Sequence, residues 1–308
     1  AKAFLKPAAQ RPNLTIMTGC HVERLLIEEG EGGKVCRGVQ FSGGGRMFTA
    51  VAHRETLLAA GAIGSPHILQ LSGIGPAAHL ARHGIAPLVD APGVGENLQD
   101  HLQLRMVYKV AGVKTLNTSA SSWFGKFRIG LEYALFQSGP MSMAPSQLGA
   151  FARSRPDLAT PDLQYHVQPL SLEKFGDPLH GFPAFTASVC NLRPESRGSV
   201  HVTGPDFRAH PAIRPNYLST PGDRDVAVRA IRLARKIAAQ PAFTRYDPSE
   251  HVPGIAFQTD DDLVRAAGAD RRGNEVARQT VIERFRRQEA RGDVSDHRNG
   301  YQHDQDRA

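Results

Sequence analysis

The alternation of apolar and polar positions changes character along the chain. Between residues 14 and 52, short runs rich in β-branched residues alternate with glycine clusters, a pattern typical of antiparallel hairpins. We therefore predict a meander of three or four strands, the first of them over LTIMT at residues 14–18. The run ETLLAA at residues 55–60 is almost continuously apolar instead, which predicts a short strand buried on both faces.

Two short helices are expected after this run. Ser65 is placed to cap the first, with Pro66 in its first turn and Gly73 at its end. The second helix begins at Pro76 and closes at Gly84. A buried strand, a sharp turn and a helix are the units of α/β architecture, in which ligands bind outside the carboxyl ends of the strands.

The second part of the chain mixes strands and helices differently. The pattern predicts strands over residues 102–112, 185–192 and 199–203, and a helix that Asp223 caps and Pro241 ends. Strands combined with segregated helices predict an α+β unit.

One further helix is rich in aromatic residues. It is expected over residues 123–136 and contains Trp123, the single tryptophan, together with Phe124, Phe127 and Tyr133. We expect these rings to pack in a core or a lid rather than to bind a cofactor.

Composition excludes several classes of protein. With 41% hydrophobic and 22% charged residues, the chain is typical of a globular protein and not of a disordered or collagen-like one. No apolar run approaches the ~20 residues of a membrane span, so we expect no integral membrane segment. Cys20, Cys36 and Cys190 lack the spacing of a zinc site or a disulfide framework, and we expect buried free thiols.

The net charge of +7 does not by itself indicate a nucleic-acid partner. Arginine is scattered along the chain, and no basic segment with interleaved aromatic residues is present. We therefore expect a solvated basic surface and no nucleic-acid partner. No pair of histidines at ligand spacing on a plausible helix indicates a metal site.

Several separated segments resemble one enzyme family. GAIGSPHILQLSGIG, residues 61–75, resembles the second signature of the glucose–methanol–choline (GMC) family of flavin-dependent oxidoreductases. The stretch at residues 11–26 resembles the family segment that brings a backbone valine, here Val22, against the adenine end of FAD. PGVGENLQDH resembles the link out of the FAD domain, and three later segments resemble the substrate domain of the choline-dehydrogenase-like branch: residues 161–166, 190–200 and 211–219.

The resemblance covers about residues 1–265 and implies FAD as the cofactor. The residues that it places against FAD are Val22, Ala60, Gly61, Ala62, Ser65 and Pro66. The chemistry of these residues is compatible with that role, because a glycine lets a backbone approach a ligand closely and a helix start exposes amide groups. Taken alone, the motif is equally compatible with a tight strand-to-helix turn that binds nothing.

The expected fold class is α/β plus α+β. Residues 1–101 are expected to form a partial Rossmann-like FAD/NAD(P)-binding domain with an antiparallel meander. Residues 102–265 are expected to form a GMC-type substrate-binding domain with an antiparallel sheet and helices. Residues 266–308 form an aberrant tail. From residue 269 onward, 17 of 40 residues are charged, which predicts disorder.

Important family motifs are absent from the chain. No GxGxxG turn is present to hold the pyrophosphate, and the GEGG at residues 30–33 lies in a polar hairpin turn. The family's HPxGT-like stretch, with its proton-accepting histidine, is also missing, so no catalytic residue is assigned. We expect a fragment that lacks both ends and is inactive alone, and a one-base frame slip near residues 268–272 is one hypothesis for the tail.

The family oxidises a small-molecule alcohol to an aldehyde by transferring hydride to flavin N5, and the electron acceptor is left open here. An FAD-binding lyase of the hydroxynitrile-lyase type is an alternative from another class. A pseudogene-like product without flavin or activity is a third. We expect a cytoplasmic location and leave peripheral association with a membrane open.

Several polar side chains have structural interpretations. His101 is expected to make a structural hydrogen bond, and Asp100 to cap or bond the chain between the domains. His166 and His180 are expected to lie away from the pocket. An ion-pair and turn network is expected among the charged residues of LRPESRG, which are Arg193, Glu195 and Arg197.

Overall fold

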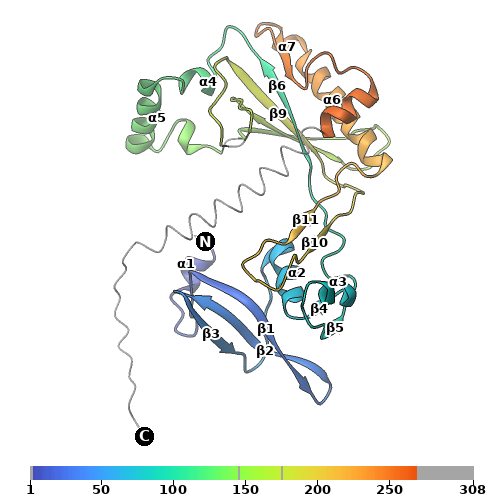
Figure 1. Ribbon diagram of the computed structural model, residues 1–308. Coiled ribbons are helices and arrows are strands. Elements are labelled where there is room, and N and C mark those ends of the chain that lie inside the picture. Colours follow the sequence, from blue (N-terminus) through green and yellow to red (C-terminus); the bar gives the residue numbers. More distant parts are fainter. Residues whose placement is uncertain (1–2, 145, 175, 269–308) are drawn as a thin grey trace.

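Two regions of different makeup follow one another along the chain (Figure 1). The computed structural model describes residues 3–144, 146–174 and 176–268, so most of the predicted charged tail lies outside the described residues. The first region contains a small antiparallel sheet and short helices. The second contains a larger sheet with the longest helix of the described chain.

The first region begins with the predicted meander. Three strands pair in the order β1-β2-β3, all antiparallel, as the glycine-separated runs predicted. Its elements are α1 Leu5–Ala8, β1 Cys20–Gly30, β2 Gly33–Gly43, β3 Arg46–Val51, α2 Gly61–Leu71, β4 Ile74–Gly75, α3 Ala77–Arg82 and β5 Val89–Asp90.

Two of the predicted strands in this region are not formed. Residues 14–18 have no regular structure, and their apolar side chains Leu14, Ile16 and Met17 are exposed. Residues 55–60 pair with no described strand, and Leu57 is 81% exposed. An apolar run becomes a buried strand only where neighbouring strands satisfy its backbone and other layers cover its faces. No described strand pairs with residues 14–18 or 55–60, so neither run becomes a strand.

Helix α2 starts earlier than predicted. It begins at Gly61 with Ala60 as its N-cap, so Ser65 and Pro66 lie inside the helix and not at its start. The Ser65 hydroxyl accepts a hydrogen bond from the Ala60 amide at 3.1 Å. The positive φ of +79° at Gly61, open to glycine at little cost, lets the chain enter the helix at that point. The predicted ends of α2 and α3, with Gly73 and Gly84 in left-handed conformations, are confirmed.

The second region is built on a five-stranded antiparallel sheet in the order β12-β6-β9-β8-β7. The three strands predicted in this part of the chain are confirmed as β6, β9 and β10, and the two predicted long helices as α5 and α6. The elements are β6 Gln103–Lys109, α4 Leu116–Ser119, α5 Trp123–Phe136, the 3₁₀ turn η1 Pro140–Ser142, β7 Leu148–Ala152, β8 Leu163–Gln168, β9 Ala184–Asn191, β10 Ser199–His201, β11 Ala212–Arg214, α6 Pro221–Ala238, α7 Pro241–Thr244 and β12 Ser249–Val252.

Helix α6 covers one face of this sheet and forms the main core with it. Met106 and Val189 on the strands are buried with Ala230 and Ile231 on the helix, and Leu263 joins the same cluster. Because side chains alternate between the faces of a strand, the opposite face carries the intervening residues. These are largely polar and include Gln103, Arg105, Gln164, His166 and Ser188.

The cap of α6 differs from the prediction. Thr220 is the N-cap, and its hydroxyl accepts from the Asp223 amide at 3.2 Å. Asp223 is 5% exposed, and its carboxylate accepts hydrogen bonds from the Asn191 amide group at 3.1 Å and from the amides of Glu195 and Ser196 at 2.9 and 2.8 Å. The Ser196 hydroxyl donates to it as well. This carboxylate therefore organises a distant turn instead of capping its own helix.

Residues 198–202 return to the first region (Figure 1). Gln70 in α2 is fully buried, and its amide donates to the Val200 carbonyl at 2.8 Å and accepts from the Val202 amide at 3.1 Å. Leu98 and Gly198 exchange backbone hydrogen bonds of 2.9 and 2.8 Å. The hairpin of β10 and β11 is thereby fastened to α2 and to the link before β6.

The aromatic rings of α5 lie at the surface. Trp123, Phe124 and Phe127 are 77%, 70% and 51% exposed, and every residue of this helix is half-buried or exposed. The part of the expectation that placed them in a core is wrong, and packing as a lid stays a prediction. Helical spacing creates an apolar face, but another element must cover that face before it becomes part of a core.

The cysteines are free, with Cys190 buried and Cys20 and Cys36 half-buried. Only Cys190 therefore meets the expectation of a buried thiol. Among the described residues, no helix combines the length and apolar character needed to cross a bilayer. The same residues contain no group of three or more side chains arranged to hold a metal ion.

Candidate functional site

The elbow, which we define as residues 60–66, presents the start of α2 to solvent. Ala60, Gly61 and Ala62 are exposed, while Ser65 and Pro66 are half-buried. A Cβ added at Gly61 would meet no atom within 4 Å, so the space beside this backbone is open. The first amide groups of a helix have no partner within it and attract polar or anionic groups. The elbow therefore offers backbone donors beside an open space.

Proline inside α2 removes one helical hydrogen bond. Pro66 has no N–H, so the helical hydrogen bond to the carbonyl of Ala62 cannot form. Helical carbonyls point toward the C-terminal end of a helix, so this one points away from the free amides at the helix start. The elbow therefore offers donors, as the sequence led us to expect, although the helix begins at Gly61 and not at Ser65.

Val22 lies on β1, half-buried and paired with Phe41 of β2. The register of this pairing shifts between Val22 and Arg24, which marks an irregularity in the ladder. Such a bulge leaves backbone groups without their partners in the ladder. The residue left out of the register is Glu23, whereas Val22 itself pairs with Phe41, so contact between the Val22 backbone and a ligand stays a prediction.

Strand β1 and helix α2 are held against each other. The Leu25 amide donates to the Ser72 hydroxyl at 2.8 Å. His67 on α2 lies near His21, the neighbour of Val22, and near His210. Burial lowers the pKa of His67, and the charges of these two histidines lower it further. The structure thereby brings the strand that carries Val22 beside the helix that carries the elbow, with a neutral imidazole between them near pH 7.

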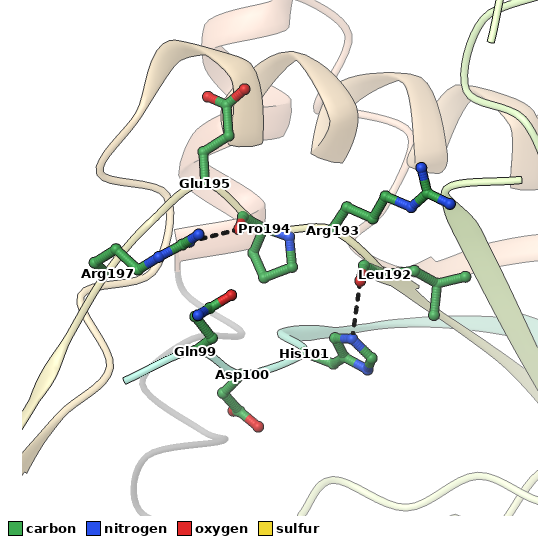
Figure 2. Close-up of a pocket in the computed structure, with 8 residues that line it drawn as sticks. All are labelled: Gln99, Asp100, His101, Leu192, Arg193, Pro194, Glu195 and Arg197. Atoms are coloured by element: carbon green, nitrogen blue, oxygen red, sulfur yellow. Dashed lines mark hydrogen bonds between the residues drawn. The ribbon is translucent and has the colours of Figure 1, made fainter. Parts of the chain in front are cut away.

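A polar hollow lies between the link at residues 99–101 and the turn at residues 192–197 (Figure 2). It measures about 580 Å³ and is polar and open. His101 bonds through Nε2 to the Leu192 carbonyl at 3.2 Å, and Arg197 donates to the Pro194 carbonyl at 2.7 Å. Both walls are therefore held by contacts between side chains and backbone.

The expected ion-pair network in this turn is not found. Arg193 donates to the Thr160 hydroxyl at 2.6 Å, and no ion pair among the described residues joins it or Arg197 to Glu195. Figure 2 shows the Glu195 side chain directed away from both arginines. Asp223 fixes the turn through the amides of Glu195 and Ser196, and Arg197 through the Pro194 carbonyl, so no ion pair is needed to hold it.

The structural interpretations of two neighbouring residues are confirmed. His101 makes the hydrogen bond described above, and Asp100 accepts one from the hydroxyl of Tyr217. His166 lies on the polar sheet face opposite Ser188. His180 bonds to the Ser171 hydroxyl at 2.9 Å. Neither histidine lines the hollow in Figure 2.

Sequence reasoning missed Gln70 and gave Asp223 the role of a helix cap, which Thr220 fills. Both Gln70 and Asp223 are buried polar residues. Gln70 fixes the position of β10 through the Val200 carbonyl, and Asp223 fixes the turn that borders the hollow in Figure 2. A glutamine within the apolar run ILQLS was a detectable signal, because an unpaired buried amide is costly. The partners of Asp223 are 27 to 32 residues away in sequence, and no local pattern reveals them.

Comparisons with known proteins point to one family. Two models of GMC oxidoreductase match the chain, over residues 1–103 and 194–285, and the second runs beyond residue 265, where the resemblance noted in the sequence ended. An oxygen-dependent choline dehydrogenase of Pectobacterium atrosepticum is 41% identical over 263 residues, which make up 85% of this chain and 46% of that protein. Its counterpart in Brucella ovis is 40% identical, with 85% of this chain matching 47% of that protein.

Solved structures give the same result. Formate oxidase of Aspergillus oryzae RIB40 matches with a TM-score of 0.76 at 25% identity, covering 84% of this chain and 49% of that one. Pyridoxine 4-oxidase of Mesorbium loti matches with a TM-score of 0.68 at 28% identity, covering 85% and 47%. The chain spans about half the length of the relatives it matches. With both family models, the curated relatives and the fold in agreement, the chain belongs to the GMC oxidoreductase family.

Proposed function

We propose that this chain is part of an FAD-dependent oxidoreductase that acts on the CH–OH group of a small-molecule alcohol. The observation that carries the proposal is the elbow, where the exposed backbone of residues 60–62 at the start of α2 borders the open space at Gly61. Family membership supports it, as does the formate oxidase neighbour, which is described in connection with FAD modification.

In this proposal the elbow and β1 bind different parts of FAD. The backbone of Ala60, Gly61 and Ala62 lies against the cofactor, with Ser65 and Pro66 shaping the turn. The backbone of Val22 lies at the adenine end. No described residue supplies a glycine-rich phosphate cradle, so we expect FAD to bind weakly to this chain alone.

The proposed chemistry needs two partners for the alcohol. When bound, FAD supplies the hydride acceptor. A base with a pKa near the operating pH takes the hydroxyl proton. We assign that base to no residue of this chain, and we expect no turnover from the isolated polypeptide. The polar sheet face that carries Gln103, Arg105 and Gln164 is the surface we propose for the alcohol, because its donors and acceptors suit a hydroxyl group.

A titration with FAD tests the elbow directly, with Gly61→Ala compared against Gly84→Ala. Both glycines have positive φ, +79° and +74°, and neither has an atom within 4 Å of an added Cβ. The two substitutions therefore impose similar backbone strain at different places. We expect Gly61→Ala to weaken FAD binding at least about tenfold and Gly84→Ala to change it less than about twofold, as measured by flavin fluorescence anisotropy.

Equal FAD affinities for the two variants would remove the elbow from the cofactor site. Wild-type protein that takes up no FAD would favour the non-catalytic alternative. The FAD-binding lyase finds no support among the relatives named above, which are dehydrogenases and oxidases.

We also propose the division into residues 1–101, 102–265 and 266–308, and a cytoplasmic location. Limited proteolysis followed by mass spectrometry tests the division, because exposed junctions are cut before packed domains. Early cuts within β9 or α6 would contradict it.

A further inference from the structure

Three histidines meet where β10 lies against α3. His79 lies in α3, His83 is the C-cap of this helix, and His201 lies in β10. The ring centroids of His79 and His83 are 4.5 Å apart, and those of His79 and His201 are 4.7 Å apart. We call these three residues the histidine cluster. It shares no residue with the elbow or with the hollow in Figure 2.

The cluster joins the first region to the segment at residues 198–202, which returns from the second. His79 bonds through Nε2 to the Val202 carbonyl at 3.1 Å, and Leu80 packs with Val202 in a small buried cluster. Helix α2, which carries the elbow, holds the same segment through Gln70. A change in the contact between α3 and β10 therefore acts on the attachment of β10 to the first region.

The hydrogen bonds define where two of these rings can take up another proton. A carbonyl only accepts, so Nε2 of His79 carries a proton and Nδ1 is left to take up a second one. Nε2 of His201 lies 2.7 Å from the Glu96 carboxylate, while its Nδ1 is buried without a hydrogen bond to any described residue. A proton added at this Nδ1 would be buried without an acceptor, which is costly.

Positive charge accumulates at this contact when the rings become protonated. Burial lowers the pKa of His79, and a backbone hydrogen bond opposes this shift. The charges of His201, His83 and Arg82 lower the pKa further. His79 is therefore neutral near pH 7.5 and gains its charge as the pH falls, when the neighbouring imidazoles become protonated as well.

Two carboxylates lie on the elements around the cluster. Glu96 is bonded to His201 and offsets part of its charge. Asp90 of β5 accepts from the Ala77 amide at the start of α3 at 2.9 Å, and no described ion pair joins it to a ring of the cluster. Three rings thus gain charge with one carboxylate bonded among them, so acid adds net positive charge between α3 and β10.

We propose that the histidine cluster is an acid-sensitive fastening between α3 and β10. Near pH 7.5 the bond between His79 and Val202 holds the two elements together. As the rings gain protons, like charges whose centroids lie 4.5 and 4.7 Å apart repel one another, and the contact opens while the large sheet stays folded. The device controls how firmly β10 is attached to the region that carries the elbow, and it requires neither FAD nor turnover.

Hydrogen exchange of two amides, followed by NMR on the full chain, measures this opening. In the closed contact the Val202 amide donates to Gln70, and the Val200 amide donates to the Gly95 carbonyl at 2.6 Å, so both are protected. After correction for intrinsic exchange rates, we expect the protection of both amides to fall at least about threefold from pH 7.5 to pH 5.5. The amide of Val189, buried within β9, should lose less protection.

Three variants separate the cluster from other effects of acid. His79→Gln keeps a donor at about the reach of Nε2 but cannot gain charge, so the fall should shrink to less than about 1.5-fold. Glu96→Gln removes the carboxylate that offsets the charge of His201, so the fall should exceed that of the wild type. His53→Gln removes an exposed histidine outside the cluster and should leave the fall unchanged.

Four results would overturn the proposal. Two concern the wild type: no fall in the protection of the Val202 amide, or an equal fall for Val189, which would indicate global unfolding. The others concern the variants: a full fall that persists in His79→Gln, or a smaller fall in Glu96→Gln than in the wild type. A loss of the fall in His53→Gln would likewise assign the acid response to histidines outside the cluster.

Discussion

The two sheets of the molecule differ in how completely they are covered. In the large sheet, six of the eight residues of β9 are buried and α6 closes one face. In the meander, all six residues of β3 are exposed, and the apolar run that follows it leaves Leu57 81% exposed. Both sequences are rich in residues that favour strands, so strand propensity does not distinguish them. The difference lies in whether another layer covers the strand.

This contrast predicts where the stability of the chain resides. The second region has a cluster of 17 buried residues, whereas the cluster under α3 consists of Leu80, Ile85 and Val202. Hydrophobic stabilisation grows with the apolar area removed from water, so the large sheet should supply most of it. Substitutions in the two regions should then differ in cost even when the chemistry of the substitution is the same.

The largest effect is expected at the buried carboxylate that joins α6 to the turn at residues 191–196. Asp223→Ala removes the acceptor of four hydrogen bonds and should lower the free energy of unfolding by about 3–5 kcal/mol. Asp225→Ala, on the same helix, removes only an exposed ion pair with Arg229 and should cost less than about 1 kcal/mol. Urea unfolding measures both.

Similar losses for the two aspartates would show that the turn does not depend on Asp223. The fold would then be maintained by the apolar contacts of α6 alone. A shift in the unfolding midpoint with an unchanged denaturant slope is the expected form of the result, because it indicates lost stability within the same folded state.

A matched pair of methionines tests the comparison between the sheets directly. Met106 on β6 is 1% exposed, and Met106→Ala should cost about 2–5 kcal/mol through lost burial and the cavity it leaves. Met47 on β3 is 45% exposed, and Met47→Ala should cost less than about 1 kcal/mol. If Met47→Ala proves as costly as Met106→Ala in the same urea experiment, Met47 is buried in solution, and a contact outside those described here covers the meander.

Local patterns predicted the elements better than they predicted burial. Glycines at turns and alternation within strands identified β1, β2, β6 and β9, because these signals depend on neighbouring residues only. Apolar residues recur near the helical period in α6, at Val226, Ala230, Ile231, Ala234 and Ile237. Of these positions, Ala230, Ile231 and Ala234 are buried, whereas Ile237 is 41% exposed. Burial of Leu57 and Trp123 was not predicted correctly, since it depends on elements distant in sequence or absent from the described contacts.

For the candidate site, the sequence likewise predicted the position of the elbow better than its detailed structure. The motif at residues 61–75 identified the elbow, because a glycine-rich turn before a helix is a local signal. The same motif misplaced the helix start, since Ser65 bonds back to the amide of Ala60 instead of capping a helix that follows it.

A change of pH is expected to alter the stability of the fold less than these substitutions do. The pKa values of His67, His79 and His251 are lowered, in each case mainly by burial, and nearby positive charges contribute. The unfolded chain therefore binds more protons than the folded one between these lowered values and about 6.5, so stability falls as the pH drops through that window. We expect the thermal midpoint of unfolding to be constant between pH 7.5 and 8.5 and to decrease toward pH 5.5.

His67 lies between β1 and α2, so His67→Gln, which cannot acquire the charge, should flatten the decrease. An equally steep decrease in this variant would mean that the contact between β1 and α2 does not respond to protonation.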